Sequence, residues 1–322
     1  MKVLVLGGTR FLGPFVVNEL LHRGHEVALL SRSYQPYFDQ PVRHFPGDAS
    51  DAVTLTTVLA QWQPGGLIDL LHHTPEQAAT VLAASTGLSH TVHVSCASVY
   101  GPRPICPVDE NTEVMKPEAA PPAVAAQIAA DQVVLQAIAD SGAPATVVRL
   151  PALYGPRDPH AAERYFARRV RDGRRRLAVP DGGLHICHRG FVQNMAWGLV
   201  QALVTEKAAG QLYNLGEEKL YTLTQLAHGV ARALDITWEV HSLPGHLWAT
   251  PYNHTSFFDL RKARAQLRYK DRMIPRDGLE LTLAWMCQQP RGDAWSWPGL
   301  EAPFDYARED ALIEEHGSRV EG

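Results

Sequence analysis

The chain is poor in lysine, in paired cysteines and in net charge. Only six of its 30 basic residues are lysine, so the other 24 are arginine. The four cysteines form no Cys-x-x-Cys pair and are too sparse to cross-link 322 residues, which favours a reducing compartment. The formal net charge of −4 gives no global attraction to nucleic acid or to an anionic membrane.

Long apolar runs and internal repeats are also missing. The opening segment MKVLVLGG enters a glycine turn after a short apolar stretch, too early for a secretory signal, and no run of about 18 apolar residues follows. A share of 45% apolar and 20% charged residues is ordinary for a globular protein. We therefore expect a cytoplasmic protein without a membrane partner.

The first 150 residues alternate short β-branched runs with helical patterns, which is typical of parallel strands joined by helices. Strands are predicted at 3–6, 26–30, 42–45, 67–71, 91–95 and 145–150, and helices at 12–23, 52–62, 76–85 and 124–140. This order predicts an α/β fold, a doubly wound parallel Rossmann sheet.

The second half has a different texture, with proline-rich turns and a tail rich in Trp and Pro. Helices are predicted at 164–171, 224–234 and 276–287, and a strand at 211–215. We place a dinucleotide-binding Rossmann domain at 1–155 and a smaller, mainly substrate-binding domain at 156–322. The segment at about 188–215 is expected to return to the Rossmann domain.

The glycine turn after the first strand is the best-defined motif. It runs Gly7-Gly8-Thr9-Arg10-Phe11-Leu12-Gly13 and opens the first helix, which is the context a dinucleotide fingerprint requires. A helix N-terminus offers free N–H groups and a positive dipole end to a pyrophosphate. We assign cofactor binding to Gly7, Thr9, Arg10, Phe11, Leu12 and Gly13, the alternative being a glycine turn that binds no dinucleotide.

The end of the second strand favours NADP(H) over NAD(H). It reads Ser31-Arg32, whereas an Asp or Glu there would hold the ribose 2′-hydroxyl of NAD. Arg32, with Arg10 in the glycine turn, suits a 2′-phosphate. A solvated loop position for Arg32 is the alternative.

Further motifs follow in order along the chain. They are Gly47-Asp48, Leu71-His72-His73, Ser95-Cys96-Ala97-Ser98-Val99-Tyr100-Gly101, Arg149-Leu150-Pro151 and Tyr213-Asn214-Leu215-Gly216. With the glycine turn, this set resembles the extended or atypical short-chain dehydrogenase/reductases, the NAD(P)-dependent epimerase/dehydratase type, over about residues 1–290. The resemblance implies cofactor contacts at Asp48, His72, Ser95 and Pro151, and substrate contacts at Arg157, Tyr165 and Arg189.

The resemblance breaks at the catalytic pair. Members of this family use Tyr-x-x-x-Lys, where the lysine lowers the tyrosine pKa for proton exchange with the substrate hydroxyl. The matching positions here are Ala123 and Gln127, and no lysine of the chain has a tyrosine four residues before it. The family's Ser or Thr is replaced by Cys96, with Ser98 two residues on.

Three residues are candidates for the missing proton donor. His160 titrates near neutrality, Cys96 becomes a nucleophile where its pKa is lowered, and Ser98 can hold a water. The alternatives are a surface histidine and a buried cysteine that only packs.

The arginines at 164–176 and two histidine pairs leave several interpretations open. The arginines could form a solvated surface, a contact between subunits or a nucleic-acid-binding patch. By the resemblance, they would instead lie beside the diphosphate of the substrate. Adjacent His72 and His73 point to opposite faces, and His185 and His188 lack acidic companions, so we expect no metal site.

Taken together, these patterns predict an NADP(H)-dependent oxidoreductase or epimerase/dehydratase-like enzyme with a non-standard proton donor. Its substrate would be a nucleotide sugar or a similar polar small molecule, with or without phosphate. The alternative is a non-catalytic NADP(H)-binding sensor or scaffold. We expect no nucleic-acid partner and leave a homodimer open.

Overall fold

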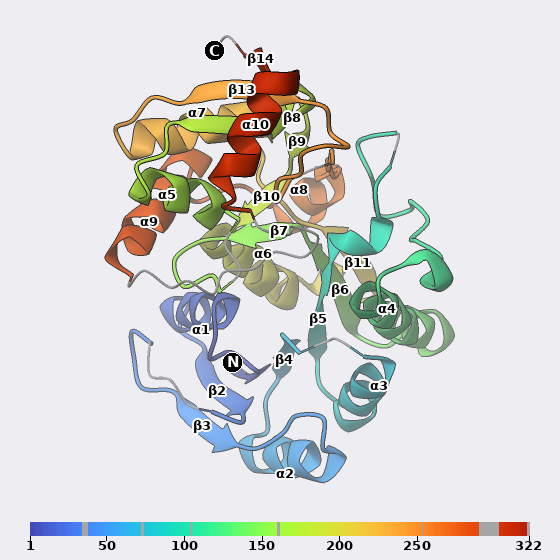
Figure 1. Ribbon diagram of the computed structural model, residues 1–322. Helices are drawn as coiled ribbons and strands as arrows, with labels where there is room; N and C mark the ends of the chain where they lie inside the picture. Colours follow the sequence, from blue (N-terminus) through green and yellow to red (C-terminus); the bar gives the residue numbers. More distant parts are fainter. Residues whose placement is uncertain are drawn as a thin grey trace.

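The computed structural model describes residues 1–33, 38–71, 74–103, 105–159, 162–252, 254–289 and 303–320. Within these ranges, seven parallel strands form the main sheet (Figure 1). In spatial order they are β11 (Gln211–Asn214), β6 (Ala145–Leu150), β5 (His90–Cys96), β4 (Gly66–Asp69), β1 (Lys2–Leu6), β2 (Glu26–Ser31) and β3 (Arg43–Pro46). The order reverses between β1 and β4, which confirms the predicted doubly wound Rossmann sheet.

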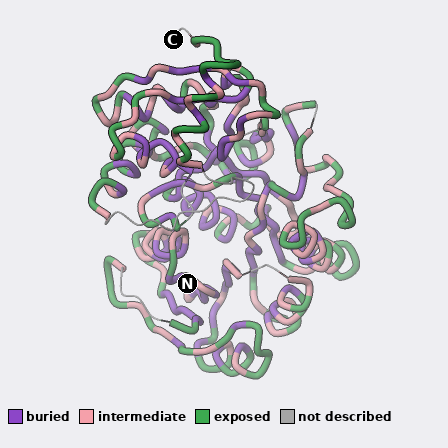
Figure 2. Tube along the Cα trace, in the orientation of Figure 1, coloured by how far each residue is buried: buried purple, intermediate pink, exposed green. Residues whose placement is uncertain are grey.

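Both faces of the sheet are covered because its strands are apolar on both sides. In β1, Val3 and Val5 pack against α1 (Leu12–His22) and α6 (Val192–Val204). Leu4 and Leu6 of the same strand point to the opposite face and pack under α2 (Ala52–Trp62). This alternation places a buried layer on each side of the sheet (Figure 2).

The remaining helices of this layer are α3 (Pro75–Ala84) and α4 (Pro122–Ser141). By length and composition, α4 is the one described helix that could cross a membrane. Here Ala130 and Val134 of α4 pack with α3 and β6, and its buried Asp131 forms an ion pair with Arg149. In this fold, α4 is a covering helix of the sheet.

Residues after 188 contribute to the main sheet layer as well as to the smaller domain. Helix α6 packs along α1, and β11 extends the sheet beyond β6 with Tyr213 opposite Val148. The short helices η1 (Ala97–Tyr100), η2 (Pro117–Ala119) and η4 (Glu206–Ala208) lie in loops of this half.

The smaller domain surrounds a separate apolar core above the carboxyl ends of the strands (Figure 1). Its strands are β7 (Ala152–Tyr154), β8 (Arg176–Pro180), β9 (Ile186–Cys187), β10 (Arg189–Phe191), β12 (Tyr221–Thr222), β13 (Glu239–Leu243) and β14 (Ser318–Arg319). Its helices are α5 (Arg164–Arg171), η3 (Asp181–Gly183), α7 (Leu223–Ala233), α9 (Pro275–Gln288) and α10 (Tyr306–His316), whereas α8 (Arg261–Leu267) packs with α6 and β11 in the main sheet layer. The strands β7 and β10 connect this domain to the carboxyl ends of the sheet strands, where a cleft between the two parts is expected for this fold.

Candidate functional site

The glycine turn has the backbone that a tight strand-to-helix connection requires. Gly7 and Gly8 both have positive φ, +85° and +79°, a region that side chains disfavour. A Cβ on Gly13 would collide with the backbone of Gly8, so the helix can approach the turn only with glycine there. Thr9 is buried in the turn, whereas Arg10 is exposed beside it.

The N-terminus of α1 is open to an anion. Its first residue, Leu12, is half-buried. The N-cap residue, Phe11, has φ 40°, and no side-chain hydrogen bond caps this end of the helix within the described residues. The first turn of the helix carries no acidic side chain. The N–H of Gly13 already bonds with the carbonyl of Arg10 and Pro14 has no N–H, so what the helix offers an anion is the N–H of Leu12 and the positive end of its dipole.

Phe11 also connects the glycine turn to the smaller domain. Its ring packs against the second apolar core, and a Cβ on Gly155 would lie 3.7 Å from it. Gly155 has to be glycine, because the same Cβ would collide with Val192 at the start of α6. The turn that holds the proposed pyrophosphate thus contacts the segment that begins the second half of the cleft.

The second strand ends in a basic surface. Arg32 is exposed directly after β2, and Ser31 is buried, its hydroxyl donating to the carbonyl of Ser33 at 2.8 Å. Asp48 is exposed after β3. Hydrogen bonds from the backbone and hydroxyl of Ser50, aided by the nearby charge of Arg32, hold the pKa of the Asp48 carboxyl below its usual value. Arg32 and Asp48 therefore lie close together, at the ends of the paired strands β2 and β3.

At the end of β4, Asp69 is buried and accepts the backbone N–H of Leu71 at 2.9 Å. The next two residues, His72 and His73, lie outside the described residues. The proposed cofactor contact at His72 is therefore a prediction that the structure does not address.

The end of β5 carries the two described candidates for proton transfer. Cys96 is half-buried and Ser98 is exposed, on the turn formed by η1. Burial, with a smaller contribution from the charge of Asp131, raises the pKa of the Cys96 thiol. Cys96 is therefore a neutral thiol at pH 7, which argues against its role as a thiolate nucleophile.

Ser95 and Gln127 belong to a buried network behind the cleft wall. Asp131 of α4 accepts the Ser95 hydroxyl at 2.9 Å, the Arg149 Nε at 3.0 Å and the Gln127 amide at 3.3 Å. All four residues are buried. Arg149 also lies 4.8 Å from the ring centre of Tyr100.

This network includes Gln127, the residue that the resemblance matches to the family's catalytic lysine. Gln127 uses its amide to hold Asp131, whose charge Arg149 already balances. Ala123, the position that matches the catalytic tyrosine, is exposed in the first turn of α4. The wall of the cleft therefore keeps its support while it lacks the reacting pair.

The remaining candidates are spread over different environments. Pro151 is buried directly after β6, and Arg157 is exposed with φ +71° in the turn after Gly155. Tyr165 is fully buried on α5, where its hydroxyl accepts the indole N–H of Trp248 at 3.2 Å. His160 lies outside the described residues.

Arg189 is fully buried among acidic and aromatic side chains. It forms an ion pair with Glu163, lies 4.0 Å from the carboxylate of Glu217 and stacks 4.1 Å from the ring centre of Tyr154. The hydroxyl of Tyr154 donates to Glu217. Burial, opposed by the charge of Arg189, raises the pKa of Glu217 to about 7.

The arginine-rich segment is held by the molecule's own C-terminal helix. Glu309 of α10 is fully buried, accepts the Ala178 N–H at 2.9 Å and lies 3.5 Å from Arg169 and 3.3 Å from Arg174. Asp310 pairs with Arg174 at 2.8 Å. A purely solvated basic face is therefore wrong for the inner arginines, because α10 supplies internal partners for them.

Of the two histidines at 185 and 188, His188 bonds with the backbone, whereas Nδ1 of His185 has no hydrogen-bond partner in the described part of the chain. His188 Nε2 bonds with the Glu217 carbonyl at 2.9 Å, and its Nδ1 accepts the N–H of Phe258 at 2.9 Å. Burial lowers the pKa of His188 to about 4, so it stays neutral. Both ring nitrogens are engaged, and no group of three or more metal-ligating side chains occurs in the described ranges.

Sequence reasoning did not find the cluster around Arg189 or the contacts of α10. The partners of Arg189 lie 26 and 28 residues away, and those of Glu309 more than 130. The sequence does not distinguish an arginine that is buried from one that is exposed. The one available signal was the unusual density of arginine at 164–176, which called for acidic partners somewhere in the chain.

Comparisons with known proteins agree with this geometry. The model of the NAD dependent epimerase/dehydratase family matches residues 3–216. The chain is 28% identical over 316 residues to 2′-dehydrokanamycin reductase of Streptomyces kanamyceticus. This match covers 91% of this chain and 87% of the relative. It is 27% identical over 300 residues to the chloroplast stem-loop binding protein of 41 kDa b of Arabidopsis thaliana, covering 86% and 77%.

Solved structures show the same fold. UDP-glucose 4-epimerase of Thermotoga maritima superposes with a TM-score of 0.74 at 19% identity, covering 89% of this chain and 99% of that one. dTDP-glucose 4,6-dehydratase of Bacillus anthracis, in complex with NAD, superposes with a TM-score of 0.75 at 18% identity, covering 92% and 98%. The glycine turn, the sheet order and the match over two thirds of the sequence lead to one conclusion: the chain belongs to the NAD dependent epimerase/dehydratase family.

Proposed function

We propose that this protein is an NADP(H)-dependent oxidoreductase or epimerase/dehydratase-like enzyme with a non-standard proton donor. The observation that carries the proposal is the free N-terminus of α1 beside two exposed arginines, Arg10 and Arg32. A dinucleotide phosphate and an additional 2′-phosphate are the groups that such an edge suits.

The residues present fit a dinucleotide. A side chain at Gly8 would meet Leu29, and one at Gly13 would collide with the Gly8 backbone. Only glycines therefore allow the tight turn that brings the N-terminus of α1 beside the strand ends, where a pyrophosphate would meet the positive end of the helix dipole. When bound, the cofactor supplies or accepts a hydride. The chain must then bind and orient the substrate and move one proton.

Proton movement falls to groups at the end of β5 and after β7. Because the Cys96 thiol stays protonated, it can donate a hydrogen bond or a proton but cannot attack as a thiolate at neutral pH. The exposed hydroxyl of Ser98 can orient a substrate oxygen or a water. His160, which follows Arg157 closely in the sequence, remains the candidate whose ordinary pKa suits acid–base work.

A polar small molecule is the substrate class that we favour. Relatives named for reductase activity and structures named for nucleotide-sugar enzymes support a sugar-like substrate. A nucleic-acid function gains no support from charge, because Arg169 and Arg174 of the arginine-rich segment are paired with α10. We therefore propose no nucleic-acid role.

The test is a pH–rate comparison of three variants on any substrate found in a reductase screen with NADPH. His160→Ala should lower kcat at least tenfold, about 1.4 kcal/mol, and remove an inflection near pH 6–7. Cys96→Ala and Ser98→Ala should each have smaller effects. Unchanged turnover in all three variants would contradict the assignment.

One observation favours the second candidate, a non-catalytic NADP(H)-binding sensor or scaffold. The position of the catalytic lysine is filled by Gln127, which is fixed by Asp131, and Ala123 is a bare methyl group. NADPH binding without hydride transfer across a broad metabolite screen would support this candidate.

Restoring the family pair distinguishes a lost function from a changed one. The double variant Ala123→Tyr/Gln127→Lys should not become a fast dehydrogenase, because the introduced ammonium group would be buried beside an aspartate that Arg149 already neutralises. NADPH oxidation with common nucleotide-4-keto sugars is the measurement, and Ala123→Phe/Gln127→Met is the matched control. Rapid oxidation by the double variant alone would show that the pocket is still that of a standard enzyme.

A further inference from the structure

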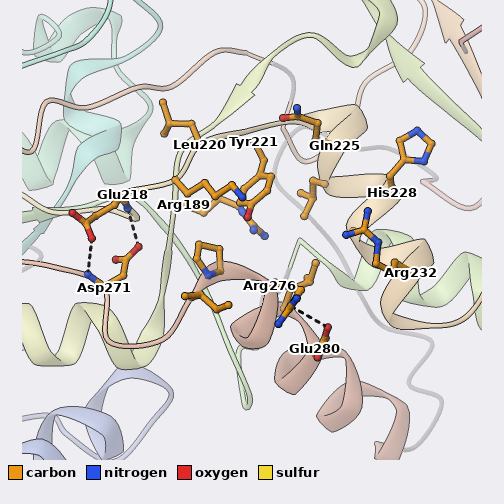
Figure 3. A pocket seen from close by; sticks show the side chains of 16 residues that line it. Arg189, Glu218, Leu220, Tyr221, Gln225, His228, Arg232, Asp271, Arg276 and Glu280 are labelled. Carbon is orange, nitrogen blue, oxygen red and sulfur yellow. Dashed lines mark hydrogen bonds and ion pairs between the residues drawn. The ribbon is translucent and has the colours of Figure 1, made fainter. Parts of the chain in front are cut away.

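A cavity of about 710 Å³ lies in the smaller domain between α7, α9 and the loop at 218–221 (Figure 3). This volume is in the range of small-molecule sites, which is about 300–1,000 Å³. None of its described lining residues belongs to the glycine turn, to the ends of β2, β4 or β5, or to residues 151–157. It is therefore separate from the proposed dinucleotide edge.

Basic side chains surround the cavity. Arg232 of α7 and Lys219 of the loop have no acidic partner among the described residues, while Arg276 lies 3.1 Å from Asp277. Figure 3 shows Arg232 and Arg276 on neighbouring helices, both drawn beside the same opening. Two uncompensated cations at one cavity favour an anion.

The acidic residues of the lining are engaged elsewhere. Glu218 pairs with Arg264 at 3.0 Å and accepts the N–H of Asp271, whose own carboxylate accepts the N–H of Glu218. Glu280 lies 3.8 Å from Arg276. These carboxylates therefore do not neutralise Arg232 and Lys219.

Two buried nitrogens of the lining have no hydrogen-bond partner in the described part of the chain. They are Nε of Arg189, on a side chain that is only 1% exposed, and Nε2 of His228. A buried polar atom without a partner destabilises a fold by about 1–3 kcal/mol, so such atoms usually have a role. Both atoms are closed off from solvent, so they lie behind the cavity wall and leave the binding of an anion to Arg232 and Lys219.

The cavity also has an apolar side. Leu220, Leu226, Ile274 and Leu279 line it together with the ring of Tyr221. An ion such as free phosphate would leave this surface empty. A ligand with a flat apolar body and one anionic group would use both sides of the cavity.

We propose that this cavity is a second binding site, for a small organic anion whose carboxylate or phosphate faces Arg232 and Lys219. The apolar body of the ligand packs against α9 and Tyr221. The proposal uses no group at the strand ends, and of the residues that the resemblance marks as substrate contacts only Arg189 lies in the lining.

Calorimetric titration of the full chain tests it with phenyl phosphate, benzoate and the neutral control benzyl alcohol. Both anions should bind, and the alcohol should bind at least tenfold more weakly. Arg232→Gln should weaken both anions about tenfold. The matched control Arg308→Gln, at an exposed arginine of α10, should leave binding unchanged.

Lys219→Gln separates binding from folding. Lys219 is exposed and has no acidic partner among the described residues, so the unfolding temperature of this variant should not fall, whereas anion binding should weaken about tenfold. Equal binding of benzyl alcohol, or full anion binding by Arg232→Gln, would overturn the proposal. Competitive displacement of phenyl phosphate by NADPH would also overturn it, because the cavity would then belong to the dinucleotide site.

Discussion

The cleft edge of the main sheet and the interior of the smaller domain both contain arginines but use them in opposite ways. At the edge, Arg10 and Arg32 are exposed next to a free helix N-terminus. In the smaller domain, Arg169 and Arg189 are fully buried against carboxylates and aromatic rings. The first pair is available to a ligand, whereas the second pair holds the domain together.

The comparison teaches how to interpret a family-based assignment. Arg189 matches a substrate contact of the family, yet here it is surrounded by Glu163, Glu217 and Tyr154. Its charge is balanced inside the protein before any substrate arrives. We therefore expect its loss to affect stability more than substrate affinity.

The largest effect should come from Arg189→Ala. Removing one partner of a buried ion pair leaves the other charge uncompensated, which should lower the free energy of unfolding by about 3–5 kcal/mol. Urea denaturation measures this, with the exposed Arg157→Ala as the matched control. A loss no larger than that of the control would show that the cluster contributes little to stability.

The second effect should come from Glu309→Gln. The amide keeps a hydrogen bond to Ala178 but loses the charge that faces Arg169 and Arg174, which should lower the free energy of unfolding by about 2–3 kcal/mol. Glu314→Gln, exposed on the same helix, is the control. Equal stability of the two variants would mean that α10 is not held by its charge.

At the exposed edge the expected effect is on the ligand. Arg32→Ala should leave the unfolding free energy unchanged and abolish a preference for NADPH over NADH of about 1.5–3 kcal/mol, the contribution of a charge-assisted hydrogen bond. Parallel calorimetric titrations with the two cofactors measure it. Tighter binding of NADH by the unmodified protein would contradict the proposal.

The smallest effect concerns pH. Since Glu217 has a pKa raised to about 7 in the folded protein, it binds a proton that the unfolded chain releases above about pH 4.5. Its contribution to stability is present below pH 4.5 and is lost as the pH rises to 7. Relative to the unmodified protein, Glu217→Gln should therefore gain about 1–2 kcal/mol between pH 4.5 and 6.

A buried neighbour, His188, changes the pH dependence of stability in the opposite direction, so it stays unmodified in both proteins. His188, with a pKa lowered to about 4, loses its contribution to stability as the pH falls from 6.5 toward 4. We would measure the unfolding free energy of both proteins by urea denaturation at several pH values. The contribution of His188 is the same in both, so it disappears from their difference. If the two proteins had parallel stability curves, Glu217 would be ionised throughout.

Local pattern was enough for most elements. The helices Ala52–Trp62 and Arg164–Arg171 and the strand Ala145–Leu150 have the predicted bounds, because their periodicity and end signals lie within the segment itself. Helix α6 was not predicted, since most of its residues are buried and the sequence shows no polar face. Helix α10 was also missed, although Asp305 caps its first turn through the N–H of Arg308.

The sequence by itself determined the sheet, the glycine turn and the absence of the Tyr-x-x-x-Lys pair. Backbone preferences and residue periodicity act over a few neighbours, so a single segment is sufficient to express them. Only the tertiary structure decided that Gln127 would support Asp131, that α10 would bind the arginine-rich segment and that Arg189 would be buried. These contacts join residues from 4 to 140 positions apart, and side-chain pairing depends on which surfaces the packed elements bring together.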